Sequence, residues 1–279
     1  MTMQRRKFMQ CGAVAMTTAM TGRLAMMRDT PAQDTKAQDT KVPYPAVDTD
    51  DVAALMRVLF IEGGHDYEEA AMHEMLARLP GMKVTRMEFS QAQPLLKPGP
   101  DGVRKDYDAL LFYDSCHEVN VTPEQQEAYV KMLEEGGLGV VIWHHAILPH
   151  YADDYAIIGG RYHTRPEHFR GHDVPASTWE EGVDFDVQIA APNHPIVKGM
   201  EPFTLHDEIY GGMSVDPGVD VLLTTNHPHA SPQLLWTKPL GKTRVVCLIP
   251  GHGSDSWNHP VFAPLLVRCL RWSRYGKID

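Results

Sequence analysis

Short apolar runs, each stopped by glycine or by polar residues, alternate with helical patterns through much of this sequence. Three of them are MRVLFIEGG (56–64), YDALLFYDSCH (107–117) and GLGVVIWHH (137–145). An apolar run without alternation is typical of a strand that is buried on both faces, as in a parallel sheet. The run MKVTRMEF (82–89) predicts a further strand between the first two.

Two helices are predicted between these strands. The segment DYEEAAMHEMLARLPG (66–81) has apolar residues at helical spacing and ends at a Pro-Gly pair. In VTPEQQEAYVKMLEEGG (121–137), Thr122 is the expected N-cap, Gln125 completes a capping box, and a glycine pair ends the helix. The order is strand, helix, strand, strand, helix, strand, which predicts an α/β fold with a doubly wound, mostly parallel sheet in three α/β/α layers.

Strand patterns resume in the second half of the chain. They are VDFDVQIA (183–190), VDVLLTT (219–225), QLLWTK (233–238) and TRVVCLIPG (243–251), and a helix over 259–276 closes the chain. Residues 146–181 are irregular but carry several aromatic side chains, so we expect them to form a wall or lid over a site. No second core is evident, and a single folded domain over 53–279 is predicted.

The first 52 residues have a different character. Arg5 and Arg6, followed by a short, mild apolar stretch, resemble a twin-arginine export motif, so residues 1–27 are interpreted as a signal peptide. Residues 28–52 repeat Ala-Gln-Asp-Thr-Lys and have almost no large apolar side chains, which predicts a disordered linker. We therefore expect a periplasmic or secreted protein.

Charge and cysteine content exclude several classes of protein. The net charge of −10 disfavours nucleic-acid binding, which needs a basic surface. No apolar run is long enough for a membrane span. Three cysteines remain after the signal peptide, which argues against a disulfide framework, and Cys247 and Cys269 lie in apolar runs typical of a core. The composition does not determine the oligomeric state, and a homo-oligomer is compatible with it.

All 15 histidines lie at or after His65, and several of them follow apolar strands. His65 ends the first strand, His117 the third, His144 and His145 the fourth, and His252 follows the strand over 243–251. The carboxyl ends of parallel strands meet at one edge of a sheet, which is where ligands bind in such folds. The alternative for each histidine alone is a strand cap that bonds a loop.

A set of motifs resembles the ThuA-like (trehalose utilisation) family. The motifs are HPI (194–196), DEIY (207–210), GKTRV (241–245), Gly251-His252 and the closing Trp272, together with GGHDY, YDALLFYDSCH and GGRYHTRP upstream. The resemblance covers roughly 57–274, and its specificity comes from the order of the motifs.

The resemblance implies a flavodoxin-like fold related to class I glutamine amidotransferases. Those enzymes hold a nucleophilic cysteine in a strand-turn-helix elbow, and the matching position here is His144. An imidazole forms no comparable stable acyl intermediate, so glutaminase chemistry is disfavoured. The family has a small residue after this histidine, whereas this chain has His145, so which of the two faces the site stays open. Cys116 is the weaker alternative nucleophile, and packing is favoured for it.

Imidazoles together with a carboxylate suit Zn²⁺ or a similar divalent ion such as Mn²⁺. The predicted ligands are His65, His144, Glu208 and His252. Asp207 or Glu208 could act as general base, and in an extended segment the two point opposite ways; a cap is the alternative for Asp207. The predicted lining is His117, His145, Tyr210 and Trp257, with core packing as the alternative for both aromatic residues.

The resemblance links the chain to carbohydrate metabolism, especially to disaccharides and their 3-keto derivatives. A carbonyl at C3 acidifies the neighbouring C–H, so a metal and a base would permit elimination or hydrolysis at the glycosidic bond. The expectation is an exported, metal-dependent lyase or hydrolase acting on a small carbohydrate. The alternatives are a sugar-binding accessory protein without turnover and an amidotransferase-like hydrolase.

Overall fold

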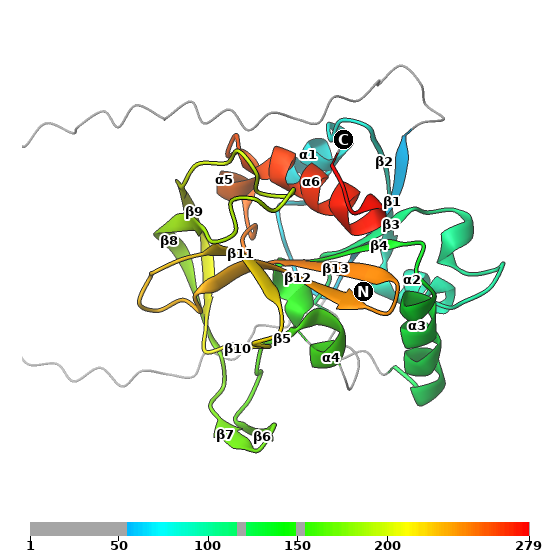
Figure 1. Cartoon of the computed structure of the whole chain (residues 1–279), viewed down its shortest axis with the longest axis horizontal. Coiled ribbons are helices and arrows are strands. Elements are labelled where there is room, and N and C mark those ends of the chain that lie inside the picture. Colours follow the sequence, from blue (N-terminus) through cyan, green and yellow to red (C-terminus); the bar gives the residue numbers. More distant parts are fainter. Residues whose placement is uncertain (1–54, 116–120, 149–153, 279) are drawn as a thin grey trace, which may run out of the picture. The chain divides into compact units, whose positions relative to one another are not determined.

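The computed structural model describes residues 55–115, 121–148 and 154–278 (Figure 1). The predicted signal peptide (1–27) and linker (28–52), and the candidate residues Cys116 and His117, lie outside these residues. No helix in the described ranges is long and apolar enough to cross a membrane.

The described residues form a nine-stranded mixed sheet of order β2-β1-β3-β4-β13-β12-β11-β8-β9. Its first five strands are β2 (Met82–Glu88), β1 (Met56–Glu62), β3 (Ala109–Phe112), β4 (Gly139–Trp143) and β13 (Thr243–Leu248), and all of them pair in parallel. The other four are β12 (Gln233–Leu240), β11 (Asp220–Thr224), β8 (Thr178–Ile189) and β9 (Phe203–Gly211), which pair antiparallel.

The sheet is therefore parallel only in its first half, whereas the sequence predicted a mostly parallel sheet. The change begins at β12 and β13, which are joined through the short turn at Gly241 and must run antiparallel. Strand patterns reveal burial, but a strand's direction depends on whether its connection is a tight turn or a crossover.

Helices cover both faces of the sheet (Figure 1). Alternate residues of β1 show this, because Phe60 packs into one buried cluster and Leu59 into the other. The Phe60 cluster includes residues of α1 (Glu69–Ala77), α5 (Ser254–Trp257) and α6 (Phe262–Tyr275). The Leu59 cluster includes residues of α2 (Phe89–Ala92), α3 (Pro123–Glu135) and α4 (Asp154–Ile158).

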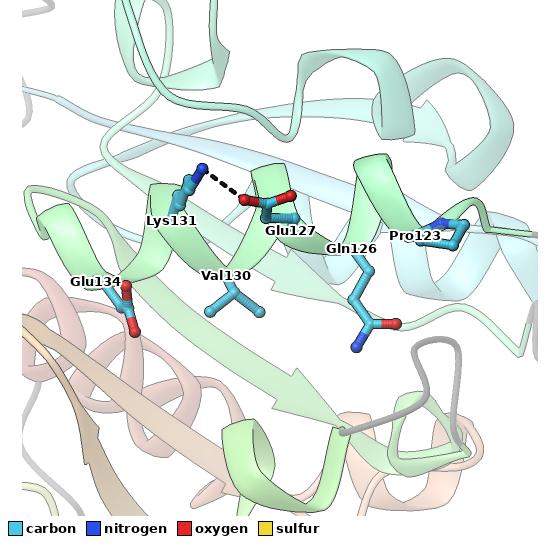
Figure 2. Close-up of a pocket in the computed structure, with 6 residues that line it drawn as sticks. All are labelled: Pro123, Gln126, Glu127, Val130, Lys131 and Glu134. Atoms are coloured by element: carbon cyan, nitrogen blue, oxygen red, sulfur yellow. Dashed lines mark ion pairs between the residues drawn. The ribbon is translucent and has the colours of Figure 1, made fainter.

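Helix α3 begins as its sequence predicts. The Thr122 side chain accepts from the Gln125 backbone N–H, and the Gln125 side chain accepts from the Thr122 N–H. Figure 2 shows a hollow along the outer face of this helix, where Lys131 pairs with Glu127 at 2.6 Å. The hollow is lined by Pro123, Gln126, Glu127, Val130, Lys131 and Glu134. None of these is a histidine or cysteine, so this face has the character of a solvated helix surface.

The described part of the irregular segment 146–181 contains short elements rather than an unstructured loop. It begins with the 3-10 helix η4 (His144–Ile147), continues through α4 and enters β5 (Gly160–Arg161), which pairs with β10 (Ser214–Val215). A hairpin of β6 (Glu167–Phe169) and β7 (His172–Val174) follows. The ring of Tyr162 lies 5.1 Å from that of Tyr210, so this segment forms part of the wall beside the candidate site. Two further 3-10 helices are η2 (Gln93–Leu95) and η3 (Val103–Lys105).

Candidate active site

Four histidines from three parallel strands gather at the carboxyl edge of the sheet. His65 follows β1, His144 and His145 follow β4, and His252 follows β13. The ring centroids of His65 and His145 lie 4.6 Å apart, those of His144 and His252 5.0 Å, and those of His65 and His252 5.4 Å. The structure thus places together the side chains that the strand ends indicated.

His144 occupies a turn between a strand and a helix, as the family resemblance implied. Its φ of +53° is unusual for a residue other than glycine, and its side chain is fully buried at the first position of η4. Its Nδ1 lies 2.7 Å from the Ile249 carbonyl oxygen. A carbonyl only accepts, so Nδ1 carries the proton and donates it. Nε2 lies 3.0 Å from the Tyr210 hydroxyl and 3.0 Å from Nδ1 of His252. It accepts from these groups while His144 is neutral, and it carries the second proton, beside Glu208, when His144 is charged.

Glu208 supplies the negative charge of the cluster. Its carboxylate oxygens lie 3.5 Å from His144 Nε2 and 3.7 Å from His252 Nδ1. Burial would raise the pKa of Glu208, but the hydrogen bond and positive charge of His144 outweigh it and lower this pKa. Burial would likewise lower the pKa of His144, but Glu208 raises it on balance. Each partner therefore favours the charged form of the other.

His145 also faces the cluster. The sequence left open whether His144 or His145 faces the site, and in the structure both histidines do. His145 is 3% exposed, and its Nε2 donates to the Tyr113 carbonyl oxygen at 2.7 Å. Its Nδ1, like that of His65, is buried and has no hydrogen-bond partner among the described residues. Burial, followed by the charges of neighbouring histidines, lowers the pKa of His145 well below its usual value.

Two overlapping groups in the described part of the chain have the donor atoms for a metal ion. One is His65, His145 and His252; the other is His144, Glu208 and His252. The ligand atoms of each group lie within 4.8 Å of one another. The predicted ligand set combined His65 with His144 and Glu208, whereas the geometry divides these residues between the groups and joins His145 to His65.

Asp207 and Trp257 hold the backbone of the cluster rather than line it. The two carboxylate oxygens of Asp207 accept from the backbone N–H groups of Gly251 and His252, at 2.5 and 3.0 Å. Trp257 is 3% exposed and donates its indole N–H to the Gly251 carbonyl oxygen at 2.9 Å. The alternatives of a cap for Asp207 and core packing for Trp257 therefore describe these side chains, and neither the general-base role for Asp207 nor the sugar-stacking role for Trp257 fits this arrangement.

Tyr113 is a site residue that the sequence analysis did not single out. It lies just after β3, and its hydroxyl is 3.0 Å from the His252 carbonyl oxygen and 3.2 Å from that of Gly251. Its ring centroid lies 4.4 Å from that of His145. Its position directly before Asp114, at a strand end, could have identified it as a site residue. Its apolar neighbours instead indicated the last core residue of the strand.

The two described cysteines are core residues, as predicted. Cys247 and Cys269 are buried, and burial raises the pKa of both thiols. A thiol that keeps its proton is a poor nucleophile, so thiol catalysis has no support among the described residues.

Protonation of the cluster should make the metal-free protein less stable in acid. The pKa values of His65, His145 and His252 are lowered, with burial the largest cause. Between pH 6.5 and the lowered pKa of each, the unfolded chain binds more protons than the folded one, so stability present above pH 6.5 is lost as the pH falls. Each such group contributes up to about 1.4 kcal/mol per pH unit, and the raised pKa of His144 opposes part of this.

In EDTA, urea unfolding from pH 7.5 to 5.5 should therefore show a falling free energy of unfolding. His145→Gln should flatten this dependence, whereas the exposed control His172→Gln should not. Parallel curves for the wild type and His145→Gln would contradict the assignment.

A family model described as ThuA, trehalose utilisation, matches residues 57–273. The crystal structure of a ThuA-like protein from Parabacteroides merdae is similar with a TM-score of 0.64 and 18% identity, over 80% of this chain and 91% of that one. A cytoplasmic protein from Salmonella typhimurium is similar with a TM-score of 0.52 and 16% identity, over 78% of this chain and 99% of that one. At these identities the two structures show a shared fold. No curated protein matches.

Proposed function

The chain belongs to the ThuA family of trehalose utilisation, and from this premise we propose that its histidine cluster binds a divalent metal ion and acts on an oxidised glycoside. The substrate class is a disaccharide or glycoside with a ketone at C3, and the bond broken is the glycosidic bond. The observation that carries the proposal is the pair of buried Nδ1 atoms of His65 and His145, which have no hydrogen-bond partner within the described ranges and lie beside His252.

The donor set fits Zn²⁺ or Mn²⁺. A buried ring nitrogen without a partner costs free energy, and a metal ion satisfies its lone pair. The Nε2 of His145 donates to the Tyr113 carbonyl, which fixes the tautomer that leaves Nδ1 available as a ligand. Three imidazoles leave one or more coordination positions for a substrate. His65 and His252 are partly exposed, whereas His145 is buried, so the accessible side of the group is formed by His65 and His252.

The second group, His144, Glu208 and His252, then supplies the general base, which is Glu208. A bound divalent ion would polarise the C3 ketone oxygen of the substrate. Glu208 is held ionised by His144 and could take the proton from C2, next to that ketone. The C–H electron pair forms the C1–C2 double bond while the bond from C1 to the glycosidic oxygen breaks. Glu208 returns the proton to the departing oxygen, so no atoms or electrons are left over.

Tyr210 and Asp207 position these groups. The Tyr210 hydroxyl lies 3.0 Å from His144 Nε2, and its ring stacks on His144 with centroids 4.9 Å apart. Burial, with the charge of Glu208, raises the pKa of Tyr210 well above its usual value, so its hydroxyl stays protonated. Asp207 fixes His252 through the backbone. Export through the twin-arginine route, to the periplasm or beyond, is part of the same proposal and rests on the N-terminal sequence.

The proposal is tested with protein purified without a histidine tag, stripped with EDTA, and then given Zn²⁺ or Mn²⁺. We expect turnover of 3-keto-trehalose, but not of trehalose, detected as released glucose and by the mass of the unsaturated product. Glu208→Gln should lower the rate by about 10²- to 10⁴-fold with the fold retained, and His172→Gln should leave it unchanged.

Two outcomes count against the proposal in different ways. Turnover that survives EDTA contradicts the metal. Sugar binding without any product, under every metal condition, favours the non-catalytic accessory role over an enzyme.

A further inference from the structure

A second cluster, separate from the four histidines, is a hydrogen-bonded chain of a serine, a histidine and a glutamate. Nε2 of His163 lies 2.8 Å from the Ser214 hydroxyl oxygen, and Nδ1 of His163 lies 2.7 Å from a carboxylate oxygen of Glu167. His163 is fully buried, while Ser214 and Glu167 are partly exposed. None of the three belongs to either metal-capable group.

The backbone brings these residues together from separate short elements. His163 follows β5, Glu167 begins β6, and Ser214 begins β10, which pairs antiparallel with β5 (Figure 1). The His163 backbone N–H donates to the Ser177 hydroxyl at 2.9 Å, and that hydroxyl donates to the Gly212 carbonyl at 3.0 Å. Hydrogen bonds of the His163 backbone and of both its ring nitrogens thus hold the imidazole in place.

The partners determine which ring nitrogen carries the proton. An ionised carboxylate only accepts, so Nδ1 of His163 donates to Glu167. Nε2 is then the acceptor and faces the Ser214 hydroxyl. Glu167 stays ionised, because the hydrogen bonds from Arg161 and then from His163 lower its pKa. This is the order of nucleophile, base and orienting acid that activates a serine in acyl-transfer enzymes, recognised by geometry rather than by sequence position.

Arg161 adds a positive charge beside the serine. It is the direct cross-strand neighbour of Ser214, so the two side chains leave the same face of the β5–β10 pair. Its Nε and Nη2 donate to Glu167 at 3.0 and 3.3 Å. A positive charge on the same face as Ser214 would favour an oxygen that develops negative charge there.

We propose that Ser214, His163 and Glu167 form a catalytic triad that hydrolyses small carboxylic esters, such as O-acetyl groups. The Ser214 oxygen attacks the ester carbonyl carbon and its proton passes to Nε2 of His163. When the C–O bond to the alcohol breaks, this proton goes to the departing alkoxide. Water then attacks the acyl-serine, again through His163, and releases the carboxylic acid and free Ser214.

This activity goes beyond the proposed function and does not depend on it. It requires no metal, and it uses no residue of the strand-end cluster. A purely structural bridge through His163 would show the same distances but would leave the Ser214 oxygen unreactive, so reactivity separates the two roles.

The test uses the full chain and a fluorophosphonate probe in the presence of EDTA. We expect one covalent adduct per chain in the intact mass, mapped by peptide sequencing to Ser214, and hydrolysis of p-nitrophenyl acetate that the probe abolishes. Ser214→Ala should lower the hydrolysis roughly 100-fold or more and Glu167→Gln at least tenfold. The exposed Ser90→Ala on α2 is the matched control and should change neither readout.

Parallel assays with an O-acetylated disaccharide and with p-nitrophenyl acetate distinguish a sugar ester from a simple ester. Wild-type protein that acquires no adduct, or an adduct elsewhere with hydrolysis unchanged in Ser214→Ala, would overturn the proposal. Labelling of the wild type does not depend on whether any variant folds. Because these assays contain EDTA and no divalent ion, failure of this activity is distinguishable from failure of the metal-dependent reaction.

Discussion

Replacing Gly251 with alanine is expected to be among the most destabilising single changes in the domain. Gly251 has a φ of +118°, a conformation that a side chain strains. A Cβ there would lie 2.3 Å from the indole nitrogen of Trp143 and 2.5 Å from the Phe262 ring. Both neighbours are core residues, and Trp143 is fixed by its 2.9 Å hydrogen bond to the Pro250 carbonyl, so neither can yield cheaply.

Overpacking and backbone strain together should cost about 3 kcal/mol or more. For a domain of this size, we expect a fall in melting temperature of roughly 6 to 12 °C, measured by calorimetry. Any metal-dependent activity should fall as well, because a shift of the backbone at Gly251 would move His252, the next residue.

Gly253→Ala is the matched control two residues away. A Cβ at Gly253 would meet only a Glu68 carboxylate oxygen at 3.9 Å, and its φ of −132° suits any residue. We expect it to change stability by less than about 1 kcal/mol. Equal effects of the two substitutions would show that the close packing around Gly251 does not determine stability.

The parallel half of the sheet could be predicted because its strands are buried on both faces. Apart from Arg57, the runs at 56–64 and 137–145 contain no polar residue until they stop at Glu62 and His144, and the helices between them carry readable start and stop signals. The antiparallel half was less accessible. β9 was not assigned as a strand, because Phe203–Gly211 includes Asp207 and Glu208, whose polar side chains break the apolar pattern.

The candidate site was predictable to the level of its position. Strand ends located His65, His144 and His252, because parallel strands share one carboxyl edge. The local sequence could not show which way each side chain points within the site. Asp207 and Glu208 are adjacent and similar, yet one binds backbone N–H groups and the other faces two imidazoles. That difference depends on the Gly251 turn, whose backbone N–H binds Asp207 from 44 residues away in the sequence.

The same limit applies to the Ser214 cluster. Ser214, His163 and Glu167 have no recognisable spacing, and Ser214 is 51 residues from His163. Only the pairing of β5 with β10 brings the hydroxyl to the imidazole.

Loss of His252 should weaken metal binding strongly whichever group holds the ion, because this residue belongs to both candidate groups. We expect His252→Ala to weaken Zn²⁺ binding more than about 100-fold, beyond the 10- to 100-fold typical of losing a residue that only supports a ligand. Affinity is measured by competition with a chromophoric chelator, using protein without a histidine tag. The exposed His172→Ala should bind as the wild type does.

Two further variants identify the group that holds the ion. If the ion is held by His65, His145 and His252, His65→Ala should weaken binding about as much as His252→Ala, and Glu208→Gln by less than about tenfold. The reverse pattern would place the ion between His144, Glu208 and His252. Glu208 would then be a ligand, and the base in the proposed elimination would have to be another group. Unchanged affinity in all three variants would contradict a metal site at this edge of the sheet.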